Sequence, residues 1–259
     1  MKSPAAPPLD EPRKFEIDEM FFSTTDRRGV IQLGNEIFVR VSGYSEAQLI
    51  GSAHNIIRHP DMPRAAFRLV WSRLLAGQPV VAYVKNCAAD GRYYWVVALI
   101  TPIAGGFLSI RFKPAASLHD VVQKAYADMR AAERALEGES DGGRRGMDAA
   151  DEILAAALRA YGCADYETFM RVVLHQELRG RDEQLQREGR RIIPLWPTDA
   201  LPAGPAGKNG RVPARGLRRR TPGHLAILPR RATRPVPSRF RGPKRPGFRL
   251  CPIASLPAR

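Results

Sequence analysis

The sequence predicts an α+β fold in which a five-stranded antiparallel sheet carries short helices over one face. Two runs of apolar and β-branched residues precede a group of short helical segments, and three more such runs follow that group. Turn residues separate neighbouring runs. Because strands from before and after the helices can join one sheet, we expect the helices to lie over a single face.

The first two strands form a predicted hairpin. Residues 20–25 (M-F-F-S-T-T) and residues 30–33 (V-I-Q-L) have strand-type composition, and D-R-R-G at 26–29 provides the turn. The group of short helices begins directly after this hairpin.

Capping residues mark the helices of that group. Asn35 is a good N-cap for a helix over residues 36–42, and Gly43 ends it. Ser45 and Gln48 have the spacing of a capping box. Pro63 suits the first position of a longer helix that runs to about residue 76. The apolar residues of this helix recur at steps of three and four, which predicts one buried face: Phe67, Val70, Trp71, Leu74 and Leu75.

The last three strands follow this helix. Residues 80–86 and 93–102 are joined through Asp90-Gly91, a strong hairpin signal. The pair Gly105-Gly106 then turns the chain into a strand at 107–112.

The rest of the chain divides by composition. We expect a flexible leader at 1–14, a domain at 15–114, a connecting helix at 115–137, a glycine-rich linker at 138–146 and a helical appendage at 147–189. Two interpretations of these helices remain open. They fold back on the domain or on each other, or they form a dimerising or signal-transmitting appendage.

The basic charge of the chain belongs to its last part. The net charge is +15, but residues 190–259 carry 17 basic and 1 acidic residues, whereas residues 1–189 carry 24 basic and 25 acidic. Arginine and proline at this density cannot build a core, so we predict a disordered basic tail at 190–259. A nucleic-acid-binding arm is the less favoured interpretation. The alternative hypothesis is a shifted reading frame of a GC-rich gene.

Several classes of function are not expected. The three cysteines are scattered without a C-x-x-C pair, the N-terminus lacks the apolar run of a signal peptide, and no segment suits a membrane helix, so we expect a cytoplasmic protein. His54 and His59 have no third ligand at suitable spacing for a metal. No nucleophile–base pair, phosphate loop or acid pair indicates an enzyme or a catalytic residue.

Specific motifs then indicate a family. The sequences F-F-S-T-T-D, F-V-R-V-S-G-Y-S, H-N-I-I-R-H-P-D-M-P, A-A-F, V-K-N and Y-W-V occur between about residues 20 and 113. This segment resembles the PAS domain of bacterial aerotaxis receptors, and the element order predicted above is similar to that of a PAS fold. Val80 stands where the family usually has tryptophan.

The resemblance implies a sensor that binds FAD non-covalently and reports the redox state of the respiratory chain. By position it implies that the following residues contribute to a flavin pocket: Asn35, Arg58, His59, Asp61, Phe67 and Asn86. Together with Phe67, Trp71 would provide an aromatic wall for the isoalloxazine. An asparagine amide would match the alternating donors and acceptors of its pyrimidine edge.

Other interpretations of these residues remain open. Arg58, His59 and Asp61 can form a structural hydrogen-bond knot before the Pro63 helix, and Asn86 can be a turn former. We therefore expect a cytoplasmic redox or oxygen sensor that acts on a downstream signalling protein, with a homodimer formed through its helices as one arrangement. The alternative function is a ligand-free PAS module for protein–protein interaction.

Overall fold

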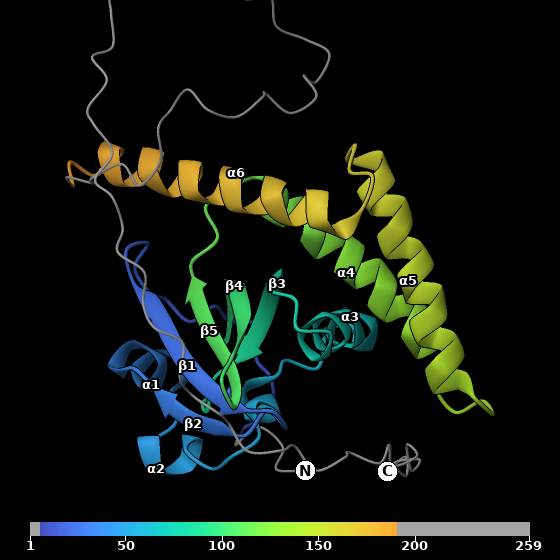
Figure 1. Ribbon diagram of the computed structural model, residues 1–259, viewed down its shortest axis with the longest axis horizontal. Coiled ribbons are helices and arrows are strands. Elements are labelled where there is room, and N and C mark those ends of the chain that lie inside the picture. Colours follow the sequence, from blue (N-terminus) through green and yellow to red (C-terminus); the bar gives the residue numbers. More distant parts are fainter. Residues whose placement is uncertain (1–5, 191–259) are drawn as a thin grey trace, which may run out of the picture. The chain divides into compact units, whose positions relative to one another are not determined.

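The computed structural model describes residues 6–190. Its centre is a five-stranded sheet in the order β2-β1-β5-β4-β3, with every neighbouring pair antiparallel (Figure 1). The strands are β1 (Met20–Asp26), β2 (Ile31–Gly34), β3 (Val80–Cys87), β4 (Tyr93–Ile103) and β5 (Gly106–Phe112). The predicted fold class is therefore confirmed.

Short helices connect β2 to β3: α1 (Glu36–Ser42), α2 (Glu46–Leu49), a 3-10 helix (His54–Ile57) and α3 (Arg64–Leu75). Asn35 caps α1, and Gly43 ends it in the left-handed conformation with φ of 73°, which glycine adopts without strain. Gln48 accepts the backbone N–H of Ser45 at 2.9 Å, as a capping box requires. Pro63 is the N-cap of α3 rather than its first residue, because its ψ of 140° is extended.

The strand registers divide the sheet into two faces. Tyr94 lies opposite Asn86, Ala98 opposite Arg111, and Ser109 opposite Ser23, so these side chains share one face. The 3-10 helix, α1 and α3 contact this inner face through His54, Phe38 and Trp71 respectively. The outer face contacts the C-terminal helices instead.

Three helices complete the described chain: α4 (Leu118–Ala135), α5 (Gly142–Ala160) and α6 (Tyr166–Arg187). The glycine-rich linker predicted at 138–146 is too long, because α5 begins at Gly142. The buried residues of α5 are small and four apart: Gly142, Gly146 and Ala150. A Cβ atom at Gly146 would lie 3.0 Å from the Cα of Glu133. These glycines therefore let α5 pack closely on α4.

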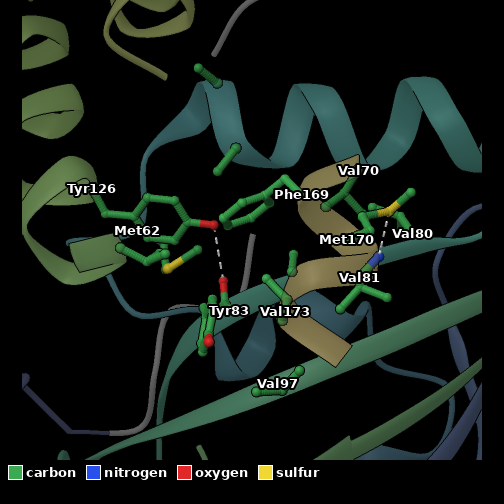
Figure 2. Close-up of a cluster of buried hydrophobic side chains, with 14 of the residues drawn as sticks. Met62, Val70, Val80, Val81, Tyr83, Val97, Tyr126, Phe169, Met170 and Val173 are labelled. Carbon is green, nitrogen blue, oxygen red and sulfur yellow. Dashed lines mark hydrogen bonds between the residues drawn. The ribbon is translucent and has the colours of Figure 1, made fainter. Parts of the chain in front are cut away.

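Side chains of the C-terminal helices cover the outer edge of β3, which is one of the two edge strands of the sheet (Figure 2). On the edge strand β3, the Val81 N–H donates to the sulfur of Met170 at 3.1 Å, and the Tyr126 hydroxyl donates to the Tyr83 carbonyl at 3.2 Å. The Tyr166 hydroxyl donates to the Val81 carbonyl at 2.9 Å. An uncovered edge strand would offer these groups to another chain. The helices fold back on the domain, as the first interpretation of the appendage expected.

The leader is also shorter than predicted. The Leu9 N–H donates to the Gly91 carbonyl at 2.8 Å, and the Arg13 N–H donates to the Tyr93 carbonyl at 2.7 Å. An ion pair between Arg13 and Asp90 adds to this contact, so from Leu9 onward the chain packs on the β3–β4 hairpin.

In the tail, the predictions for 191–259, including the shifted reading frame, lie outside the described residues. Within 6–190 no helix is sufficiently long and apolar to span a membrane.

Candidate ligand-binding site

The inner face of the sheet carries a concentration of buried polar side chains. The strand registers place Ser23, Asn86, Tyr94, Ser109 and Arg111 on this face, and each is at most 5% exposed. Buried polar groups are normally satisfied by hydrogen bonds. On this face, several are not.

Three of these side chains have an atom without a hydrogen-bond partner. They are the amide nitrogen of Asn86, the hydroxyl of Tyr94 and the hydroxyl of Ser109. Asn86 and Tyr94 are directly opposite each other on β3 and β4. Each of these groups can donate a hydrogen bond to a ligand. Asn86 and Tyr94 lie together, whereas Ser109 lies opposite Ile100, six residues further along β4.

Arg111 is the charged member of the set. Its Nη1 and Nη2 atoms donate to the Ser23 hydroxyl at 3.1 and 3.0 Å, and Nη2 lies 2.6 Å from His54 Nε2. Because arginine only donates, Nε2 accepts this bond and the imidazole is neutral. Burial, together with the nearby Arg111 charge, holds the pKa of His54 well below its usual value.

The structure brings three residues of the predicted site together. The Arg58 guanidinium lies 4.2 Å over the Phe67 ring, and its Nη2 donates to the Met62 carbonyl at 3.2 Å. The Arg58 backbone forms a β-bridge with Asn86 on the edge strand β3. Arg58 therefore connects Phe67 of α3 to Asn86 of the edge strand. Asn86 is buried rather than placed in an exposed turn.

His59 and Asp61 make structural contacts. The buried His59 accepts the Asp61 N–H at its Nδ1 atom at 3.1 Å. The half-exposed Asp61 carboxylate pairs with Lys85 at 2.9 Å and with Arg134 of α4 at 3.2 Å. These bonds are those of the hydrogen-bond knot that the alternative interpretation of this segment expected, and they also join it to α4.

Asn35 and Trp71 lie apart from Asn86. The Asn35 side chain accepts the N–H groups of Phe22 at 3.0 Å and Phe38 at 3.1 Å, and it donates to the Met20 carbonyl at 2.8 Å. Its hydrogen bonds therefore join α1 to β1. Trp71 packs edge-on against Phe107 of β5, with ring centroids 5.7 Å apart. A separate apolar hollow lies between α3 and the helices α4, α5 and α6.

Sequence reasoning missed Arg111, Ser109, Tyr94, Ser23 and His54 as site residues. The signal for two of them is weak, because Ser109 and Arg111 alternate with apolar residues in F-L-S-I-R-F. Such alternation usually places the polar residues in solvent. Here Phe112, which faces the opposite side of the sheet, belongs to a buried apolar cluster that includes Leu118 of α4, so both faces of β5 are covered.

The burial of histidines predicts acid sensitivity. Burial lowers the pKa of His59 to about 4, and it also lowers the pKa values of His54 and His119. Between about pH 4 and 6.5 the unfolded chain binds protons that the folded chain excludes, so stability should fall as the pH is lowered through this window. We expect the melting temperature to drop by several degrees between pH 7 and pH 5, measured by circular dichroism.

The variant His59→Asn isolates one contribution, because its side-chain oxygen can still accept the Asp61 N–H. Its melting temperature should depend less steeply on pH than that of the natural protein. An unchanged slope would show that His59 does not titrate on unfolding.

Comparisons with known proteins agree with this fold. The family model described as PAS fold matches residues 33–107. The aerotaxis receptor of Escherichia coli (strain K12) is 43% identical over 99 residues, which are 36% of this chain and 20% of the receptor. A nitrogen fixation regulatory protein of Klebsiella pneumoniae is 37% identical over 81 residues, 31% of this chain and 16% of that protein. The chain thus spans about a fifth or less of these curated relatives.

Among solved structures, this chain is similar to the PAS domain of a protein from Colwellia psychrerythraea, with 23% sequence identity and a TM-score of 0.32. The match covers 36% of this chain and 85% of the Colwellia chain. A Rhodobacter sphaeroides LOV protein is 18% identical, covering 55% of this chain and 89% of that chain with a TM-score of 0.36. The family model and the identity to the receptor confirm the resemblance noted in the sequence. This chain contains a PAS domain of the aerotaxis-receptor type.

Proposed function

We propose that this PAS domain is a cytoplasmic signal-transduction sensor that reports redox or oxygen state through non-covalently bound FAD. The observation that carries the proposal is the set of buried groups on the inner face that can donate hydrogen bonds and lack partners: Asn86, Tyr94 and Ser109. The isoalloxazine presents several acceptors at its edge, so it is a chemically suitable ligand. The 43% identity to a protein named aerotaxis receptor supports a role in sensing.

The described residues have the amide and aromatic side chains that such a ligand needs. Asn86 would bind the edge of the ring system with its amide, and the aromatic side chain of Phe67 would form a wall. Trp71, which packs on Phe107 apart from Asn86, would contact another part of the ligand. Arg58, stacked on Phe67, would hold that ring in place. When bound, the flavin supplies reversible uptake of electrons. The proposal gives these residues binding roles and no catalytic role.

A change at the ligand would be passed on through the segment around Arg58. Its backbone contacts Asn86, while Asp61 in the same segment pairs with Arg134 of α4. We propose that the C-terminal helices carry the signal to a downstream signalling protein. A homodimer formed through these helices is one arrangement.

An absorbance spectrum of the purified full chain tests the proposal directly. We expect a yellow protein whose flavin bands bleach with dithionite and whose chromophore, released by heat, is FAD. A colourless folded protein that takes up no added FAD would reject flavin sensing. That result would favour the ligand-free interaction module.

The variant Asn86→Ala should weaken FAD binding about 10- to 100-fold, because a buried hydrogen bond is lost. Titration of the ligand-free protein with FAD, followed by flavin fluorescence, measures the change. Asn55→Ala is the matched control, since Asn55 is exposed in the 3-10 helix. Equal affinities for the two variants would remove Asn86 from the site.

A further inference from the structure

Arg111 is a buried charge without an acidic partner. It lies on β5, is 4% exposed, and its hydrogen bonds go to the hydroxyl of Ser23 and the neutral imidazole of His54. Within the described part of the chain, no carboxylate forms an ion pair with it.

Such a charge is costly to the folded protein. Moving an ion from water into a protein interior costs several kcal/mol, and a carboxylate partner normally offsets this cost. Neutral acceptors offset less of it, because a guanidinium has five N–H donors and the three bonds to Ser23 and His54 leave two. A structural role alone would be better served by an apolar residue of similar size.

The surroundings of Arg111 lack negative charge but contain further donors. The Phe38 ring lies 5.5 Å from the guanidinium carbon and stacks on His54 at 5.9 Å. Ser109 and Tyr94, whose hydroxyls have no partner, lie on the same face. The positive charge and the donors together complement a group that carries negative charge on oxygen or on a ring nitrogen.

We propose that Arg111, with Ser23 and His54, forms the subsite that receives the negative charge of the ligand. This inference rests on the proposed function: in a flavin, the group concerned is the edge of the ring system that gains negative charge on reduction. Arg111 then favours the reduced ligand over the oxidised one and raises its reduction potential. Asn86 and Arg58 hold the ligand elsewhere, whereas Arg111 determines its redox response.

Two variants of the full chain test the proposal: Arg111→Met removes the charge at similar size, and Arg111→Lys keeps it. In Arg111→Met we expect the reduction potential of bound FAD, measured against redox dyes, to fall. A tenfold loss of preference for the reduced form corresponds to about 30 mV for two electrons. The reduction potential of Arg111→Lys should lie between those of the natural protein and Arg111→Met.

Melting temperatures of the ligand-free proteins provide an independent readout. Because an unpaired buried charge is removed, Arg111→Met should melt at a higher temperature than the natural protein. A lower melting temperature, failure to fold, or an unchanged potential would overturn the proposal. If the natural protein takes up no FAD but Arg111→Met melts higher, flavin sensing fails while a charged subsite for another anionic ligand stands.

Discussion

Replacing Glu177 with alanine is expected to lower the free energy of unfolding by about 3 kcal/mol. Glu177 of α6 is fully buried; one carboxylate oxygen accepts the Tyr83 hydroxyl at 2.5 Å, and the other accepts the N–H groups of Ala115 at 2.5 Å and Ala116 at 3.1 Å. Removing it leaves the buried Tyr83 hydroxyl and two part-buried N–H groups without an acceptor. Urea unfolding followed by circular dichroism measures the loss.

Glu183→Ala is the matched control on the same helix. Glu183 is half exposed and pairs with Arg179 at 2.9 Å, so its removal should cost no more than about 0.5 kcal/mol. The double variant with Tyr83→Phe should lose less than the sum of the two single variants, because both remove the same bond. Equal losses for Glu177→Ala and Glu183→Ala would mean that Glu177 does not hold α6 on the sheet.

The sheet and its helices were predictable because their signals are local. Asp90-Gly91 connects β3 to β4, and Gly43 adopts the left-handed conformation that ends α1. Each signal depends on a few neighbouring residues and on the spacing of apolar residues along the chain. The order of the elements then leaves few ways to assemble one sheet.

The start of α5 was not predictable for the opposite reason. Gly142 and Gly146 have poor helix propensity and resemble a flexible linker. Their helical conformation depends on packing against α4, where Gly146 touches the backbone of Glu133. Such a contact connects residues on two helices, and no pattern within either segment indicates it.

The candidate site also combines residues that a local motif indicated with residues that only the fold brings together. The motif around Arg58 led to residues that do meet in the structure, namely Arg58, Phe67 and Asn86. Arg111 and His54 are 57 positions apart, and their contact exists because β5 lies inside the sheet with the 3-10 helix over it. A single arginine in a strand carries no local sign that it is buried.

Replacing Glu133 with alanine is expected to free the first turn of α3. Glu133 of α4 is 3% exposed, and its two oxygens accept the N–H groups of Arg64 at 2.9 Å and Ala65 at 2.8 Å. These are N–H groups that a helix start leaves without an internal partner, and a carboxylate there also interacts favourably with the helix dipole. We expect a loss of about 2 kcal/mol in stability. Hydrogen exchange of these two amides should accelerate at least tenfold.

Glu137→Ala provides the control, since Glu137 is half exposed just beyond the C-terminal end of α4 and pairs with Arg130 at 2.8 Å. It should leave exchange at Arg64 and Ala65 unchanged. Because α3 carries Phe67 and Trp71, this bond connects the proposed ligand walls to α4, and coupling between two sites is reciprocal. Ligand binding should therefore slow exchange at the α3 start in the natural protein but less in Glu133→Ala. Equal slowing in both would show that the ligand does not act on α4 through this carboxylate.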